Sequence, residues 1–337
     1  MDSVTQITLG AAVGEAVLGR KIGNKALLWG GLAGLIPDLD VIPSEFMNDV
    51  NSVDFHRSVS HSVLFFLVLT PGLSWLAQKA HKSFDHVRKS EWHLLFFLGL
   101  FTHALLDCFT TWGTQLFWPL EYRVAFQSVF VIDPIYTIPL LAGVIGAAFS
   151  RKKLNRRKLF NRTGLVISSM YLVLTLVNKQ YVNSQFQGSL HQQEIQPIEL
   201  DSRPTPFNNL LWSANVETED GFYIGYYSLL DEKWPITFKF YPKNHQLLTD
   251  SLRQAPLVQK LLKITQGNYT LENGKGQQLI LHDLRFGQLA GWLDASEYPA
   301  ATRFVFSYKI KPQEVLHSQK PGIYRHEPQF NTASGIL

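Results

Sequence analysis

Cysteine is nearly absent from this chain of 337 residues, because Cys108 is the only one. A single thiol cannot form an internal disulfide, and it excludes every zinc motif built on several cysteines. Any metal site must therefore use histidine and carboxylate side chains. Charged residues are also scarce, at 17% of the chain against about 25% in soluble proteins. We therefore expect part of the chain to lie in a membrane.

Hydrophobic and aromatic residues, in contrast, are plentiful. They make up 46% and 13% of the chain, which gives enough apolar surface to exclude a disordered protein. The formal net charge of +4 says less than the positions of the charges. The length favours two domains.

Long apolar runs are concentrated in the first half of the sequence. A helix that crosses a bilayer needs about 20 predominantly apolar residues. We predict four such helices, over residues 58–78, 92–112, 124–150 and 163–178. Residues 5–18 and 25–36 predict two short, closely packed helices that end at Pro37. A cleavable signal peptide is the alternative for the N-terminus, but the first residues lack Lys and Arg, and Glu15 interrupts the apolar run.

The basic residues predict the orientation of these helices. Three loops, at 19–25, 79–91 and 150–162, hold fourteen Lys and Arg, whereas the intervening loops hold only Arg57 and Arg123. Basic loops remain in the cytoplasm. We therefore expect a multi-pass protein of the bacterial cytoplasmic (inner) membrane whose C-terminal part lies outside the cytoplasm. The same rule accounts for the basic clusters without nucleic acid, which we do not expect as a partner.

The composition becomes that of a soluble domain from about residue 181. Residues 222–227, 236–241 and 304–308 alternate as strands do, and Asn273-Gly274 is a hairpin-turn dipeptide. An amphipathic helix is predicted after Asp250-Ser251. The predicted fold is thus an α-helical membrane bundle at 1–180, carrying the metal site, followed by an extracytoplasmic α+β domain with an antiparallel sheet at 181–337.

Ionisable residues at membrane depth are the main functional signal. Each costs about 2.5–3.5 kcal/mol on insertion scales, so each is a functional candidate. His103 and Asp107 are spaced i and i+4 and share one helix face, with Thr110 and Thr111 one turn further on. On the predicted topology all the candidates can meet near the outer surface. The other candidates are Asp38, Asp40, His56, Arg57, His61 and Asp133.

Histidine and carboxylate groups that meet at one depth are ordinary ligands of Zn²⁺ or a related divalent ion. The alternative is that each group only hydrogen-bonds to its neighbours in a structural network. Glu15 can face either this group or the neighbouring short helix.

Five motifs in the first half occur together in a known family. They are Ile-Pro-Asp-Leu-Asp at 36–40, His-Arg-x₃-His-Ser at 56–62, Thr-His-x₃-Asp-x₂-Thr-Thr-Trp-Gly at 102–113, Trp-Pro at 118–119 and Phe-Val-Ile-Asp-Pro at 130–134. In these motifs the chain resembles the bacterial and archaeal membrane-bound metal-dependent hydrolases typified by the LexA-regulated inner-membrane protein YdjM. The soluble part is similar to the tail of one subgroup through 203–208, Trp212 and 221–227. The resemblance implies an integral membrane protein with a metal centre.

A second similarity is to zinc-dependent phospholipase C and its nuclease relatives, through an early Asp, a later His and His-x₃-Asp. The usual His-x₃-Glu partner and the additional histidines of those enzymes are missing here. We therefore do not expect a full three-zinc site.

We assign roles to the candidate residues on this basis. Asp40, His61, His103 and Asp107 are the expected metal ligands, with Thr110 and Thr111 beside them. His56 and Asp38 either complete a second metal site or act as base and supporting partner. Arg57 suits a phosphate or carboxylate on the substrate. Asp133 either holds a histidine tautomer or caps its helix.

The predicted function is metal-dependent hydrolysis, through a metal-activated water, of a lipid or a lipid-linked, phosphoester-type substrate at the outer leaflet. The competing hypothesis is a non-catalytic membrane protein. In that case the polar cluster is structural or binds an ion, and the outer domain binds an envelope protein partner. A transporter is a third alternative, but the sequence lacks the paired broken helices typical of transport folds.

Overall fold

A computed structural model describes residues 1–81, 84, 86–231, 234–288, 290–293, 303–317 and 322–326. The contacts divide the chain into two compact units. The N-terminal unit comprises 1–44, 55–181 and 203–210, and the C-terminal unit comprises 45–54, 182–202 and 211–337. Residues 45–54 thus belong to the C-terminal unit, and residues 203–210 belong to the N-terminal unit.

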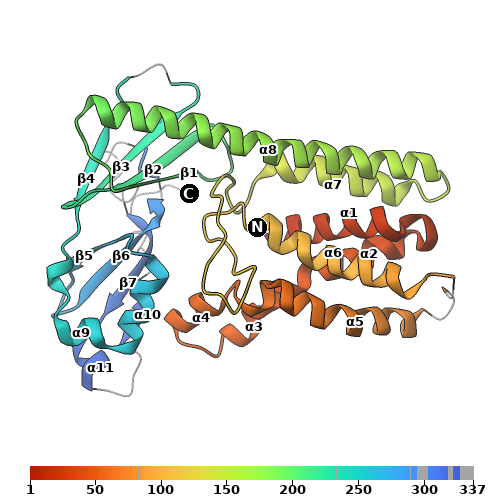
Figure 1. The fold of residues 1–337 in the computed structure, drawn as a ribbon, viewed down its shortest axis with the longest axis horizontal. Helices are drawn as coiled ribbons and strands as arrows, with labels where there is room; N and C mark the ends of the chain where they lie inside the picture. Colours follow the sequence, from red (N-terminus) through yellow and green to blue (C-terminus); the bar gives the residue numbers. More distant parts are fainter. Residues whose placement is uncertain are drawn as a thin grey trace, which may run out of the picture. The chain divides into compact units, whose positions relative to one another are not determined.

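Helices form the N-terminal unit (Figure 1). Short 3₁₀ and helical turns lie between the longer helices, at η1 (Ile36–Asp40), α3 (Val41–Ser44) and η2 (Val59–His61). The helix α4 (Asp49–Phe55) falls largely in the other unit. The longer helices are α1 (Ser3–Ile22), α2 (Asn24–Leu35), α5 (Val63–Ala80), α6 (Lys89–Asp107), α7 (Pro134–Phe149) and α8 (Leu154–Gln192).

Three helical segments in the described part of the chain are long and apolar enough to cross a membrane: Asn24–Ser44, Val63–Ala80 and Leu154–Gln192. The first differs from the sequence prediction, because the helical backbone continues through Pro37 as a 3₁₀ turn and α3. Of the four predicted spans, 58–78 and 163–178 fall on these segments, whereas 92–112 and 124–150 do not. The predicted helix 163–178 is part of the much longer α8.

The helix predicted over 124–150 begins ten residues late, at Pro134, and α7 has only 16 residues. Asp133 explains this start, because its carboxylate accepts hydrogen bonds from the N–H groups of Ile135 and Tyr136. Proline has the right φ for the first helical position. The segment before it forms an isolated antiparallel bridge between Thr114 and Val124.

Glycines allow α1 and α2 to approach very closely. A Cβ on Gly10 would lie 2.3 Å from the carbonyl oxygen of Gly30, and a Cβ on Gly14 would lie 2.3 Å from that of Ala26. Such small-residue contacts are typical of packed membrane helices. They hold the end of α2, and with it η1, at a fixed position beside α1.

Two four-stranded sheets form most of the C-terminal unit, with strand orders β1-β2-β3-β4 and β5-β6-β7-β8. The strands pair antiparallel from β2 to β4 and from β5 to β8, as predicted. The Asn273-Gly274 dipeptide lies where the turn between β5 and β6 begins, but Asn273 still pairs with Leu279 and the connection runs from Gly274 to Gln278. The strands are β1 (Glu199–Pro204), β2 (Leu211–Glu217), β3 (Gly221–Ser228), β4 (Phe238–Pro242), β5 (Tyr269–Asn273), β6 (Leu279–Gln288), β7 (Phe304–Ile310) and β8 (Ile323–Arg325).

Helices and short turns complete this unit. Val182, Phe186 and Leu190 of α8 pack on the first sheet around Trp212. The single helix predicted after residue 250 is two helices, because Pro256 can begin a helix but cannot continue one. These elements are η4 (His245–Leu247), α9 (Asp250–Gln254), α10 (Pro256–Thr265) and α11 (Pro312–His317).

Candidate metal centre

Three elements of the N-terminal unit bring two aspartates and two histidines together. Asp38 lies in η1, His61 ends η2, and His103 and Asp107 lie one turn apart on α6. Ser62 caps α5 directly after His61, which fixes where that helix begins. The spacing of His103 and Asp107 places both on one face of α6, as predicted from the sequence.

The four side chains converge on one small volume. Nε2 of His61 lies 3.1 Å from Nε2 of His103. Asp38 Oδ1 is 3.4 Å from both nitrogens. Asp107 Oδ2 is 3.5 Å from His61 Nε2 and 3.6 Å from His103 Nε2. The side chains of His61, His103 and Asp107 are fully buried, whereas that of Asp38 is 18% exposed.

Hydrogen bonds on the far side of each imidazole determine which nitrogen carries its proton. His103 Nδ1 lies 2.6 Å from the carbonyl oxygen of Gly34, so Nδ1 is the donor. Pro37 contributes to this contact, because it has no N–H to donate to Gly34 in a 3₁₀ turn. His61 Nδ1 faces the hydroxyl of Ser60 at 2.9 Å and Asp40 Oδ2 at 3.5 Å. In their neutral forms, with the proton on Nδ1, both rings direct the lone pair of Nε2 inward.

Two inward lone pairs and two carboxylate oxygens repel one another unless a positive charge lies between them. Within the described residues, the buried Asp107 Oδ2 accepts no hydrogen bond of normal geometry, and Arg57 Nε lies 3.0 Å from it as an ion-pair partner. A tetrahedral Zn²⁺ with ligands at about 2.0–2.1 Å would separate its ligand atoms by about 3.3 Å. The five distances given above are close to this value, and all four ligand atoms lie within 4.8 Å of one another. The group therefore fits a divalent ion.

Asp40 does not belong to this four-residue group, although the sequence predicted it as a ligand. The structure places Asp38 in the group instead. Asp40 accepts hydrogen bonds from Ser60 Oγ at 2.7 Å and from the backbone N–H of Arg57 at 3.1 Å. Its other oxygen lies 2.9 Å from Nδ1 of His56. Asp40 thus orients both His56 and His61 from outside the group.

Arg57 is buried, and its guanidinium lies against the group. Its Nε is 3.0 Å from Asp107 Oδ2, and its Nη1 donates to Thr110 Oγ1 at 2.8 Å. The backbone of Arg57 has a φ of +59°, which an L-residue seldom adopts. The Arg57 side chain thus neutralises the Asp107 carboxylate, whereas the sequence suggested a role toward the substrate.

Asp107 Oδ1 has partners that the sequence analysis missed. It accepts a hydrogen bond from Gln6 Nε2 at 2.9 Å and forms an ion pair with the amine of Met1. Gln6 could have been found by the rule that identified His103, because it is a polar side chain within a small-residue helix. Ser60 was missed because the spacing of the motif does not show which way a hydroxyl points.

Asp133, Thr110 and Thr111 lie outside the four-residue group. Asp133 caps α7 and accepts a hydrogen bond from the hydroxyl of Tyr171 at 2.8 Å, so the structure favours the capping role left open above. Thr110 donates to the carbonyl oxygen of Asp107 at 2.8 Å and thereby supports the end of α6. Thr111 follows in the same turn and is half-buried.

Glu15 is separate from the candidate metal centre. It forms a buried ion pair with Arg157 of α8 through both carboxylate oxygens. Arg157 also donates to Asn24 Oδ1 at 2.5 Å. The sequence allowed Glu15 to face the candidate group or the neighbouring short helix, and neither alternative includes this arginine.

A comparison with known proteins agrees with the family resemblance of the five motifs at 36–134. A protein-family model described as "YdjM inner membrane protein" matches residues 1–182, which contain the whole four-residue group. No curated protein and no solved structure matches the chain.

Proposed function

Because the chain belongs to the YdjM inner membrane protein family, we propose that it is a membrane-embedded, metal-dependent hydrolase. Its substrate would be a lipid or lipid-linked phosphoester at the outer leaflet. One observation carries the proposal: two imidazole nitrogens and two carboxylate oxygens face one another at 3.1–3.6 Å with their lone pairs directed inward.

Asp38, His61, His103 and Asp107 would hold the ion, and Zn²⁺ is the first candidate because its ligand geometry fits. A bound divalent ion would lower the pKa of a water toward neutrality and polarise a phosphoryl or acyl oxygen. Asp38 is the only partly exposed member of the group, so the substrate would approach from its side.

His56 is placed to act as the general base at this side of the group. Its side chain is 39% exposed, and its Nδ1 bonds to Asp40 Oδ1. That bond fixes the tautomer and leaves Nε2 free of the proton. The His56 ring lies 5.9 Å from the His61 ring, centroid to centroid. Nε2 of His56 would therefore accept the proton of the attacking water.

Arg57 and Gln6 would hold Asp107 in place during this reaction. The guanidinium balances the carboxylate at 3.0 Å, and the amide of Gln6 fixes its other oxygen. Partners of this kind orient ligands and typically change metal affinity or activity 10–100-fold when they are removed.

A non-catalytic role is the second candidate, and the same Arg57 contact favours it. Asp107 already has Arg57 as a cationic partner, so the group could be a charge-balanced structural network. The C-terminal domain would then be the functional part and would bind an envelope partner.

Metal analysis of the detergent-purified protein tests the first proposal. We expect a stoichiometric transition metal in the wild type and its loss in His103→Ala and Asp38→Asn. His93→Ala is the matched control, because it removes a half-buried histidine from the same helix. A wild type without metal, or a His61→Ala/His103→Ala double variant that retains it, would contradict the metal site.

Hydrolysis is tested separately with a chromogenic phosphodiester and with phospholipid vesicles. His56→Gln should keep the metal and lower kcat by about 10²–10⁴-fold, the usual contribution of a general base. A metal-loaded wild type that cleaves neither substrate, or a His56→Gln variant with unchanged kcat, would favour the non-catalytic role.

A further inference from the structure

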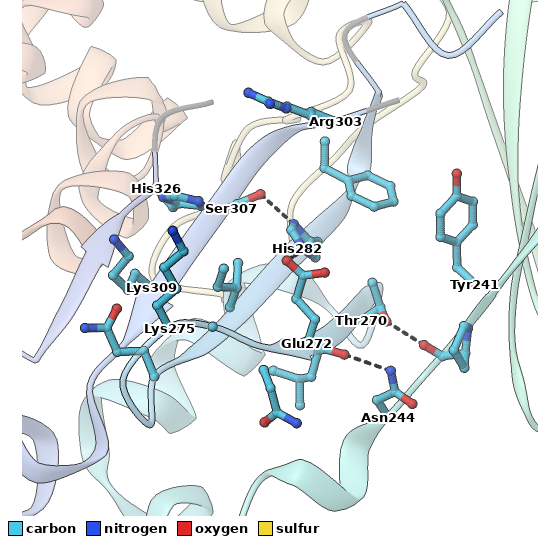
Figure 2. A pocket seen from close by; sticks show the side chains of 17 residues that line it. Tyr241, Asn244, Thr270, Glu272, Lys275, His282, Arg303, Ser307, Lys309 and His326 are labelled. Carbon is cyan, nitrogen blue, oxygen red and sulfur yellow. Dashed lines mark hydrogen bonds and ion pairs between the residues drawn. The ribbon is translucent and has the colours of Figure 1, made fainter. Parts of the chain in front are cut away.

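The C-terminal unit contains a cavity of about 950 Å³ on one face of its second sheet. Figure 2 shows its lining side chains, which come from β5, β6 and β7, from the end of β4 and from the β5–β6 turn. This volume is within the range of small-molecule sites.

The register of the strands explains why this face is polar. Thr270, His282 and Ser307 are paired across β5, β6 and β7, so they form one row on the sheet. Lys309 pairs with Ile280 in the next row of the same face. The residues between them point to the opposite face, where Leu271, Leu281 and Tyr308 are buried. The helix α10 packs against β6.

Cations predominate around the cavity. Among the residues that the structure describes, Lys275, Arg303 and Lys309 line it together with one carboxylate, that of Glu272. The net formal charge of the lining is therefore +2 with both histidines neutral. Glu272 Oε1 lies 3.2 Å from His282 Nε2, and this hydrogen bond lowers the pKa of Glu272.

The walls of the cavity are held by hydrogen bonds before any ligand binds. Thr270 donates its hydroxyl to the carbonyl oxygen of Pro242, and Asn244 donates to that of Leu271 (Figure 2). His282 Nδ1 lies 2.7 Å from Ser307 Oγ. The Tyr241 ring packs edge-on against Phe304, which adds an aromatic wall. A preformed, partly aromatic cavity costs little to order on binding.

We propose that this cavity is a binding site for a phosphate monoester, with the phosphate between Lys309, Arg303 and Lys275 and the organic part toward Tyr241. A phosphate monoester carries close to two negative charges at pH 7, which matches the net charge of the lining. Arg offers a planar fork to phosphate oxygens and Lys a point charge. The carboxylate of Glu272 neutralises only one of the three cations, so the described lining stays positively charged.

The full chain in detergent is tested with soluble glycerol phosphate, by isothermal titration calorimetry. Lys309→Gln and Arg303→Gln should each weaken binding by about tenfold or more, since a charge-assisted hydrogen bond contributes about 1.5–3 kcal/mol. Lys311→Gln is the matched control, because this lysine lies outside the cavity lining and pairs with Glu314 at 2.8 Å. It should bind like the wild type.

A second arm distinguishes the source of the phosphate. Nanodiscs that contain phosphatidic acid are compared with phosphatidylcholine nanodiscs. Lys309-dependent binding of glycerol phosphate indicates a soluble ligand, and Lys309-dependent binding of phosphatidic acid alone indicates a lipid headgroup. Either result supports the site. Lack of binding to both, or equal affinity in wild type, Lys309→Gln and Arg303→Gln, would overturn it.

This site does not depend on the candidate metal centre. A His61→Ala/His103→Ala variant should retain wild-type affinity for glycerol phosphate. If that variant loses binding while Lys309→Gln keeps it, the phosphate binds at the metal centre and the cavity proposal is wrong.

Discussion

At the scale of single residues, two variants of Asp133 distinguish a helix-capping role from a role in the metal site. Its carboxylate accepts from two N–H groups of α7 and from Tyr171. Asp133→Ala should lower the free energy of unfolding by about 1–3 kcal/mol, from the lost cap and the unpaired hydroxyl. Asp133→Asn should be nearly neutral, because Asn caps helices as well as Asp does. Thermal unfolding checks both variants, and metal loss in Asp133→Asn would contradict the capping role.

At the proposed anion site, His326 should make ligand binding depend on pH. Partial burial, followed by the nearby Lys309 cation, lowers its pKa below the ordinary value, while Glu272 acts in the opposite sense; His282 and Arg303 are its other charged or titratable neighbours. His326 is therefore neutral at pH 7, and a bound dianion would favour its protonated form. By linkage, sulfate, which stays a dianion in this range, should bind more tightly as the pH falls below about 6.5.

Calorimetry with sulfate at about pH 7.5 and about pH 5.5 measures this dependence. His326→Gln should bind sulfate with nearly the same affinity at both values. Tighter binding at the higher pH in the wild type would contradict the predicted sign.

The choice between Asp38 and Asp40 shows how far single residues could be predicted. The spacing of His103 and Asp107 determines that they share a helix face, so their proximity followed from the sequence. Asp38 and Asp40 lie in a 3₁₀ turn, and their directions depend on where Pro37 ends the preceding helix. Arg157 lies 142 positions from Glu15, so no local pattern could predict their contact.

At the scale of elements, the α1–α2 contact determines where His103 finds its acceptor. A Cβ on Gly30 would lie 2.2 Å from the carbonyl oxygen of Gly10, so Gly30→Ala must push the two helices apart. That shift would displace Gly34, whose carbonyl oxygen orients His103. We expect a lower unfolding temperature and about 10–100-fold weaker metal binding.

Gly72→Ala is the matched control for this prediction. Gly72 lies inside α5, and nothing lies within 4 Å of an added Cβ. Alanine favours a helix interior by up to about 1 kcal/mol over glycine, so this variant should be neutral or slightly more stable. Equal behaviour of the two variants would show that the close α1–α2 contact is not required.

Helices and strands were predicted best where one periodicity dominates the segment. The strands at 222–227 and 304–308 were found because apolar residues there alternate, and the helix containing His103 was found because its apolar run is long. The start of α7 was missed because residues 124–133 are as apolar as the helix that follows. Hydropathy alone cannot show that Asp133 begins the hydrogen-bonded turns.

At the scale of the whole molecule, the excess of Lys and Arg in three loops predicts the orientation. Cys108 is buried, so an introduced cysteine can be labelled over a low background. Gln313→Cys lies in the C-terminal domain and Lys152→Cys in a basic loop, and both side chains are exposed. In intact spheroplasts a membrane-impermeant maleimide should label Gln313→Cys, but label Lys152→Cys only after lysis. The reverse pattern would contradict the predicted orientation.

The Glu15–Arg157 ion pair has a consequence for synthesis of the protein. The ribosome makes α1 long before it makes the arginine that neutralises Glu15, and at 5–20 residues per second the delay is roughly 7–30 s. During this interval the first helix carries an acidic group without its partner. We therefore expect α1 to pack stably only once α8 has been made. Nascent chains that stop before residue 157 should be degraded by quality-control proteases faster than chains that extend past α8.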